Sequence, residues 1–401
     1  MKMKLLMLAT AALACAGCNE RKDDLKPGMV AEGGQPVLTA QAVLDVLDGE
    51  STAPQLTISP SLQRQVTSIL EQHVNEDSVE QGWAVVLSAK DGAVLAMADC
   101  GVDDASLRPL AVKKTFEPGH VVSPVTLALA FADEKVTPDT MISTGAEPEK
   151  YVELPRDAHA FAVPEISVKE ALARSSNVIL AKIGQDLGDR VFSGFSIWGL
   201  DRKGAVDLGI FNVAFDGGGD LGGMSGSRRL TSRVAIGQGF KVNALQLARA
   251  YAILANKGRR IEPHLVRHGS GKGAFEQVIS RDAAEMVCGI LEIDGKSTGK
   301  RAIVSGVRVA GKTGTANCKD TVSGRYVFDR FAASFAGFFP LDNPAYVIVV
   351  CYETKKIQGK RADFFGGIHP ASTFAEIVKF IESLNDSVVS GETSNVCEDL
   401  K

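Results

Sequence analysis

Strand-like runs stand near both ends of the chain, with helix-like segments between them. Two apolar runs, at 83–87 and 93–97, are joined through Lys90-Asp91-Gly92, which predicts a hairpin. Late in the sequence come further strand-like runs, at Val307–Ala310, Ala332–Phe339 and Ala345–Tyr352. Sheet segments at both ends imply one sheet closed by distant parts of the chain, with a helical body inserted. We therefore expect an α+β fold.

Several helices are predicted with identifiable ends. Apolar residues recur at helical spacing over 62–74, and a last amphipathic helix is expected over 371–384. Ser167 is placed to cap a helix that runs through residue 174. Asn243 is placed to cap another through residue 256, which Gly258 would close.

The first residues have the pattern of an export signal. Lys2 and Lys4 precede an apolar run, Leu5 to Ala14, which ends in Ala16-Gly17-Cys18. A transmembrane helix needs about 20 apolar residues, so this run is too short to be one. Ala-Gly-Cys resembles a bacterial lipobox, in which Cys18 would be lipidated. We expect an exported protein on the periplasmic face of the membrane, lipid-anchored through Cys18 or simply secreted.

Composition and polarity suggest the remaining boundaries. We expect an export signal at 1–18, a polar tether at 19–55, one large domain at 56–385 and a C-terminal tail at 386–401. The formal net charge of −4 argues against a nucleic-acid binder that depends on a general positive field. Only 6 His and 7 Cys are present, widely scattered, so no metal site and no cofactor are expected.

Two short motifs carry the chemistry of the domain. One is the segment from Ala310 to Ala316, which contains Lys312-Thr313-Gly314-Thr315 and should lie on a strand. The other is Ser175-Ser176-Asn177, between two predicted helices. Each motif alone is weak, but their order, separation and flanks make the combination specific.

With these motifs, residues 56–381 resemble the transpeptidase domain of class B penicillin-binding proteins, the septal and elongation-type D,D-transpeptidases. The resemblance also covers Phe116-Glu-Pro-Gly, Gly237-Gln-Gly, Ser297-Thr-Gly-Lys-Arg-Ala and Ala333-Ser-Phe-Ala-Gly-Phe-Phe-Pro. It implies the fold shared with serine β-lactamases, an antiparallel sheet flanked by helices with a helical subdomain inserted. It also implies a role in peptidoglycan synthesis.

The family uses a serine nucleophile and a lysine three residues later. By resemblance, Ser175 would relay a proton to the leaving group and Asn177 would hold the substrate amide. Lys312, Thr313, Gly314 and Thr315 would form the substrate-binding segment, with the charged and hydroxyl groups on the substrate carboxylate. The implied ligands are stem peptides ending in D-Ala-D-Ala, and β-lactams.

The nucleophile motif is altered in this chain. Where the family has Glu-Pro-Gly-Ser-x-x-Lys, this sequence has Glu117-Pro118-Gly119-His120-Val-Val-Ser123. His120 thus takes the nucleophile position and Ser123 the base position. Without a lysine, nothing obvious activates Ser123.

Three hypotheses follow. The first is a pseudoenzyme that keeps a groove for stem peptides, binds β-lactams without acylation, and meets cell-wall synthesis proteins. The second is an active D,D-transpeptidase or carboxypeptidase that uses Ser123 and His120, which are neighbours at i and i+3. Ser123 would then sit roughly 5 Å along the helix from the expected position of the nucleophile. The third is a scaffold or sensor module that needs a partner rather than turnover.

Overall fold

The computed structural model describes most of the chain from residue 56 to residue 389. The described ranges are 56–76, 79–102, 108–157, 161–201, 206–207, 212–213, 221, 226–265, 276–319, 326–354 and 365–389. The predicted export signal and tether lie outside them. None of the helices in these ranges combines the length and the hydropathy needed to cross a membrane.

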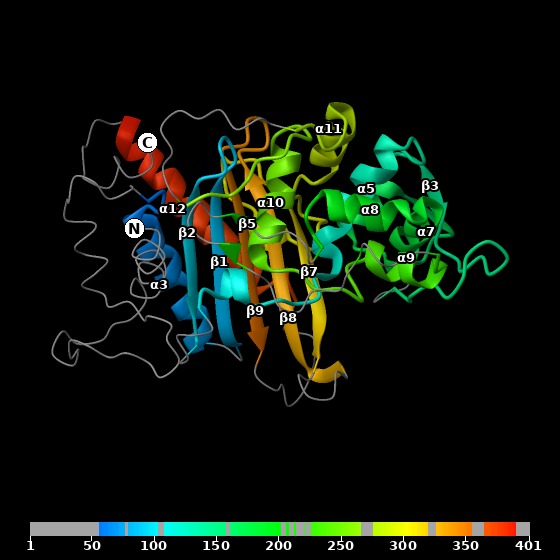
Figure 1. The fold of residues 1–401 in the computed structure, drawn as a ribbon, viewed down its shortest axis with the longest axis horizontal. Helices are drawn as coiled ribbons and strands as arrows, with labels where there is room; N and C mark the ends of the chain where they lie inside the picture. The colour runs from blue at the N-terminus through cyan, green and yellow to red at the C-terminus, as the bar shows by residue number, and fades with distance from the viewer. Residues whose placement is uncertain are drawn as a thin grey trace.

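The centre of the molecule is a five-stranded sheet in the order β2-β1-β9-β8-β7, with every neighbouring pair antiparallel (Figure 1). Its strands are β1 (Val79–Ser88), β2 (Val94–Cys100), β7 (Ala310–Lys319), β8 (Tyr326–Phe339) and β9 (Tyr346–Thr354). The N-terminal hairpin joins the C-terminal strands through β1 and β9, where Trp83 pairs with Cys351. The expected closure of one sheet by distant segments is confirmed.

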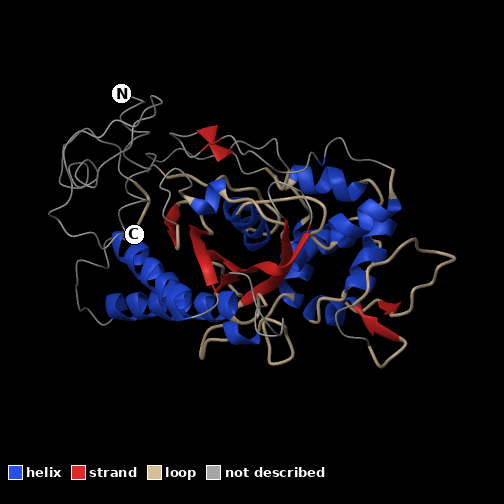
Figure 2. Ribbon diagram, turned by 90° about the horizontal axis from the view of Figure 1, so that it is seen from below, coloured by secondary structure: helices blue, strands red, loops and turns tan. Residues whose placement is uncertain are grey.

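The sheet is buried on both faces. Alternate residues of β1 point to opposite faces, so that Trp83 and Val85 join one apolar cluster and Ala84 and Val86 join another. On the second face lie α3 (Pro60–Glu76) and α12 (His369–Val389), which also pack on each other. On the first face α10 (Ala244–Ala255) packs against β1, β8 and β9. In Figure 2 helices lie on both sides of the strands.

The chain between the two groups of strands forms the helical body. In Figure 1 α5, α7, α8 and α9 lie on the side of the sheet away from α3 and α12. Its helices are α4 (Leu110–Lys113), η2 (Gly119–Val122), α5 (Ser123–Ala132), α6 (Val168–Ala173), α7 (Asn177–Leu187), α8 (Arg190–Ile197), α9 (Arg228–Ala235), α10, α11 (Arg281–Ile290) and η4 (Lys300–Ala302). Short strand pairs are β3 (Met141–Ser143) with β4 (Glu165–Ser167), and β5 (Val206–Asp207) with β6 (Asn212–Val213). The expected helical insertion is confirmed.

The predicted helix ends agree with the structure. Ser167 caps α6 by accepting from the backbone N–H of Glu170. Asn243 and Gln246 form a reciprocal capping box at the start of α10. After α10, Gly258 has a φ of +84° and donates its N–H to Ile253 O, which closes the helix as expected.

One predicted strand is wrong. The run Val307–Ala310 contributes only Ala310 to β7. Upstream of it, Val304 and Val307 form an isolated bridge around Gly306, whose φ is +80°. Beyond Gly306, Arg308 O and Val309 O accept the N–H groups of Leu341 and Ile293, each at 2.9 Å, and neither of these partners lies on a strand. The apolar side chains of Val307 and Val309 instead pack against one face of the sheet.

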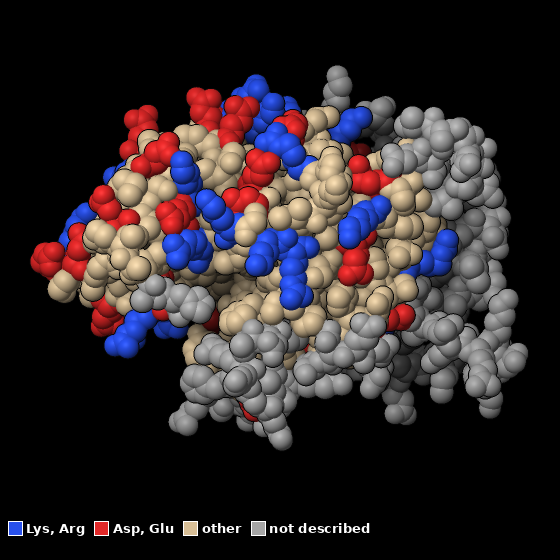
Figure 3. Space-filling view, turned by 180° about the vertical axis from the view of Figure 1, so that it is seen from behind, with Lys and Arg blue, Asp and Glu red and all other residues tan. Residues whose placement is uncertain are grey.

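The surface carries both signs of charge. Lys and Arg are interspersed with Asp and Glu over the face seen in Figure 3. This mixture agrees with the small net charge of the sequence.

Candidate functional site

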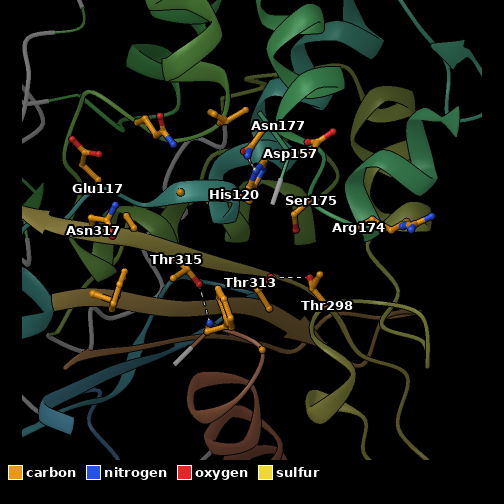
Figure 4. A pocket seen from close by; sticks show the side chains of 18 of the residues that line it. Glu117, His120, Asp157, Arg174, Ser175, Asn177, Thr298, Thr313, Thr315 and Asn317 are labelled. Carbon is orange, nitrogen blue, oxygen red and sulfur yellow. Dashed lines mark hydrogen bonds between the residues drawn. The ribbon is translucent and has the colours of Figure 1, made fainter. Parts of the chain in front are cut away.

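A cavity of about 810 Å³ lies between the edge strand β7 and the helical body. Its walls come from η2, the junction of α6 and α7, the turn before η4, β7, and the segment that leads into α12. His120, Ser175, Asn177, Thr313 and Thr315 line it, so most of the sequence-predicted site residues meet in one place (Figure 4).

The remaining predicted residues lie behind the cavity wall. Lys312 is 3% exposed and reaches the site through its ammonium group. Gly314 packs against η2, where a Cβ would lie 2.2 Å from Pro118 O. Ser123 has no exposed surface. Close packing at Gly314 explains why the strand must lack a side chain at this point.

His120 is fixed by a close contact between two backbones. Gly119, with a φ of +59°, donates its N–H to Gly237 O at 2.9 Å. A Cβ on Gly237 would come within 2.1 Å of Gly119 O, so the approach requires glycine. The following 3₁₀ turn eclipses residues i and i+3, which brings His120 above Ser123.

The imidazole of His120 bridges two polar side chains. Its Nδ1 lies 3.0 Å from Ser123 Oγ and its Nε2 lies 2.7 Å from Asn177 Oδ1. Asn177 Nδ2 donates to Arg156 O at 2.6 Å, so Oδ1 is the acceptor that faces His120. His120 therefore carries its proton on Nε2, and Nδ1 accepts from the hydroxyl of Ser123.

The neutral form of His120 is favoured by its surroundings. The pKa of His120 is lowered to about 3, mainly by burial and also by the charge of Lys312, while the hydrogen bond to Asn177 opposes both effects. A neutral imidazole matches the tautomer that the hydrogen bonds require. Above this pKa the ring is neutral, and its two nitrogens are both used in hydrogen bonds, Nδ1 with Ser123 and Nε2 with Asn177.

Lys312 contacts the hydroxyl of Ser175. Its Nζ donates to Ser175 Oγ at 2.5 Å and to Thr313 O at 3.3 Å. Burial lowers the pKa of Lys312 to about 7. Ser175 has a φ of +56°, which is uncommon for a residue with a Cβ and directs its hydroxyl toward β7. The pair is a hydroxyl and an amine that titrates near neutrality.

The two threonines of β7, Thr313 and Thr315, flank Gly314 in the sequence, and the hydroxyl of each contacts a neighbouring segment. Thr313 Oγ1 lies 2.8 Å from Thr298 Oγ1, and Thr315 Oγ1 accepts the N–H of Gly366 at 3.0 Å (Figure 4). Thr313 Oγ1 also lies 3.3 Å from Lys312 Nζ, so the first of these hydroxyls stands beside the amine. The result is a set of donors suited to a carboxylate.

Sequence reasoning missed several residues of the site. Asp157 fixes the start of α7 by accepting from Ser176 Oγ and from the N–H of Val178, both at 3.1 Å. At another part of the cavity wall, Tyr326 Oη donates to Glu117 at 3.0 Å and accepts from Arg233 at 3.2 Å. Nothing in the local sequence around these residues indicates such long-range contacts.

Thr298 differs in this respect, because its segment Ser297-Thr-Gly was already part of the family resemblance. Its side-chain role beside Thr313 became visible only with the fold.

The sequence matches the penicillin binding protein transpeptidase domain over residues 82–379. The chain belongs to this family. PbpB of Mycolicibacterium smegmatis is 28% identical over 84% of this chain and 55% of that protein. The probable peptidoglycan D,D-transpeptidase PenA of Neisseria gonorrhoeae is 27% identical over 88% of this chain and 62% of its own length. The chain thus spans little more than half the length of these relatives.

Solved structures of the family share the fold. The apo transpeptidase domain of Burkholderia pseudomallei penicillin-binding protein 3 aligns with a TM-score of 0.71 and 26% identity, covering 84% of this chain and 98% of that one. Penicillin-binding protein 3 of Mycobacterium tuberculosis, complexed with aztreonam, aligns with a TM-score of 0.70 and 25% identity, covering 83% of this chain and 79% of that one. The predicted fold is confirmed as that of a penicillin-binding transpeptidase domain.

Proposed function

We propose that the protein acts in peptidoglycan synthesis as a non-catalytic penicillin-binding protein homologue. It binds stem peptides ending in D-Ala-D-Ala, and β-lactams, in the groove along β7 without forming an acyl-enzyme. In this proposal, His120 and Ser123 fill the positions of the family's nucleophilic serine and basic lysine.

One observation carries the proposal. The imidazole of His120 stands at the cavity wall where the family sequence has serine, and both of its nitrogens are hydrogen-bonded. The hydroxyl below it, on Ser123, has no exposed surface. A nucleophile must come within about 3–3.5 Å of the carbonyl carbon. Ser123 is out of contact with the cavity, and the Nδ1 lone pair of His120 is already engaged by the hydroxyl of Ser123, so neither group is placed to attack.

The binding function rests on the other wall of the groove. Lys312, Thr313 and Thr315 offer an amine and two hydroxyls for a terminal carboxylate. In the described part of the sheet, β7 is an edge strand, so one side of its backbone is free of a neighbouring strand. An extended peptide can add to such an edge through main-chain hydrogen bonds.

Calorimetric titration with Nα,Nε-diacetyl-Lys-D-Ala-D-Ala tests the binding function. We expect reversible binding that Thr313→Val weakens by about tenfold or more, because one hydrogen bond to a charged group, worth about 1.5–3 kcal/mol, is lost. Thr137→Val, which changes an exposed threonine between α5 and β3, is the matched control and should leave binding intact. Absence of binding to the wild-type protein contradicts the proposal.

A second candidate function is favoured by the chain of hydrogen bonds from Ser123 through His120 to Asn177. A hydroxyl, an imidazole and an orienting amide also make up the general form of a catalytic triad. In this alternative the protein is a D,D-transpeptidase or carboxypeptidase with Ser123 as nucleophile. Ser123→Ala should then abolish turnover of the same peptide, whereas the favoured proposal predicts no turnover in either protein.

Export and lipid anchoring are proposed from residues outside the described ranges. The protein would be held on the periplasmic face of the membrane through a lipid on Cys18. Labelling of cells with a radioactive fatty acid should mark the wild-type protein and not Cys18→Ser. A labelled Cys18→Ser protein contradicts this anchor.

A further inference from the structure

A group of cations stands at one end of the groove. Lys296, Lys300 and Arg301 lie on a single turn and all line the cavity, and Arg174 lines it from the end of α6. Within the described ranges, the three residues of the turn form no ion pair with an acidic side chain. Arg174 pairs with Glu170 at 2.9 Å, where both side chains are exposed. Among the described residues, the turn therefore presents three positive charges that have no ion-pair partner.

The acidic side chains close to this turn are already engaged. Asp294 accepts from the N–H groups of Lys296 and Ser297, at 2.9 and 2.8 Å, and from Ser297 Oγ at 2.8 Å. Glu292 receives two hydrogen bonds from Arg308, both at 2.8 Å. Asp294 offsets part of the charge of Lys296, but it is held in the turn and does not line the cavity.

The turn is also rigidly placed. Lys300 donates its N–H to Ser297 O, and Thr298 donates its N–H to Ala173 O, each at 3.2 Å. Gly367 packs on the same segment, where a Cβ would lie 2.1 Å from Thr298 O. The cations thus extend from a backbone that is fixed to both walls of the groove.

The cationic turn lies beside the expected carboxylate site. Thr298 Oγ1 is 2.8 Å from Thr313 Oγ1, next to the ammonium of Lys312. Figure 4 shows Thr298 and Arg174 at one end of the pocket and Glu117 and Asn317 at the other. A single terminal carboxylate would occupy the Lys312–Thr313 site and leave the charges of the turn without a counterpart.

We propose that this turn is a second anion subsite, formed by Lys300 and Arg301 with Lys296 beside them. It takes a side-chain carboxylate on the terminal residue of the bound peptide, whose α-carboxylate lies at Lys312 and Thr313. The groove then selects peptides that end in an acidic D-amino acid over those that end in D-alanine. This inference rests on the proposed peptide-binding function and deepens it.

The test compares three probes that differ at one residue: Nα,Nε-diacetyl-Lys-D-Ala-D-Glu, its D-Gln analogue, and the D-Ala peptide. The D-Glu and D-Gln probes have the same shape and differ in one charge. At low ionic strength we expect D-Glu to bind about three- to tenfold more tightly than D-Gln, the effect of one or two exposed ion pairs. The advantage should shrink as salt is added.

Two double variants distinguish a local anion subsite from a general electrostatic attraction by the positive charges of the whole protein. Lys300→Gln with Arg301→Gln should bring the D-Glu to D-Gln affinity ratio close to one. Lys135→Gln with Lys379→Gln removes the same charge from exposed residues that do not line the cavity, and should keep the ratio. An equal fall of the ratio in both double variants overturns the subsite.

The outcomes also separate this inference from the function on which it rests. If the D-Ala probe binds and the D-Glu and D-Gln probes bind equally, the second subsite is wrong and the groove function stands. If no probe binds, the proposed function fails, and the subsite fails with it.

Discussion

Replacing Lys312 with methionine should stabilise the protein at and below neutral pH. Lys312 is 3% exposed, and the hydrogen bonds of its ammonium group go to the oxygens of Ser175 and Thr313 rather than to a carboxylate. Burial lowers the pKa of Lys312 from 10.5 to about 7, which measures how strongly folding disfavours the charged form. Methionine has a similar unbranched shape without the charge.

The expected magnitude follows from this pKa. Each pKa unit corresponds to about 1.4 kcal/mol, so the fall from 10.5 to about 7 represents on the order of 5 kcal/mol against the charged form. Methionine also removes the hydrogen bonds of the ammonium to Ser175 and Thr313, a loss of about 1–3 kcal/mol. We expect Lys312→Met to raise the free energy of unfolding by about 2–4 kcal/mol at pH 6.

The pH dependence has a definite sign. Between pH 7 and 10.5 the unfolded chain holds a proton on Lys312 that the folded protein has released. The wild-type stability therefore rises with pH across this window, and the variant lacks that rise. From pH 6 to pH 9 the advantage of Lys312→Met should shrink by about 2.5 kcal/mol.

Urea unfolding at pH 6 and pH 9 measures both effects, provided that the m-values agree. Lys135→Met is the control, because Lys135 is exposed and has no burial penalty to relieve. A Lys312→Met protein that is less stable than the wild type at pH 6 would refute the reasoning. A stability difference that is the same at both pH values would refute it as well.

Three further outcomes are expected. His120→Ser combined with Ser123→Lys introduces the serine and lysine that the family resemblance implies at these positions, and should give a protein that benzylpenicillin labels covalently, as seen by intact mass. The wild-type protein should lose at most about 3 kcal/mol of stability between pH 6.5 and pH 4, because the folded protein keeps the pKa of His120 near 3 while the unfolded chain binds a proton, and His120→Gln should remove this loss. If urea unfolding shows the same loss of stability between these pH values for both proteins, the prediction is contradicted. Gly237→Ala should cost at least about 3 kcal/mol in thermal unfolding, since a Cβ there meets Gly119 O at 2.1 Å, whereas Gly188→Ala, with a φ of +56° but open space around it, should cost about 1 kcal/mol. Equal costs for the two glycines would count against the packing argument.

Local patterns were sufficient to predict much of the fold. The hairpin of β1 and β2, the cap of α6 at Ser167 and the capping box at Asn243 each depend on residues close together in sequence. The strand position of Lys312 and Thr313 was predicted because apolar and β-branched residues precede the motif. The strand expected at 307–309 failed because an apolar run shows that a segment packs, not that a neighbouring strand is available.

The chemistry of the site depends on contacts that no local pattern contains. The hydrogen bond from His120 to Asn177 joins residues 57 positions apart, and the contact from Lys312 to Ser175 joins residues 137 apart. The sequence resemblance brought these residues together in one expected site. It did not predict that His120 would bridge Ser123 and Asn177, because that contact depends on the 3₁₀ turn and on the packing of Gly119 against Gly237.

The central claim is that the groove binds ligands without forming an acyl-enzyme. The most direct test is the intact mass of the purified protein after incubation with excess benzylpenicillin, beside an active penicillin-binding protein treated in the same way. The account predicts an unshifted mass for this protein and a labelled control. A mass increase equal to one ring-opened drug molecule would contradict the account, and peptide mapping would then identify the nucleophile.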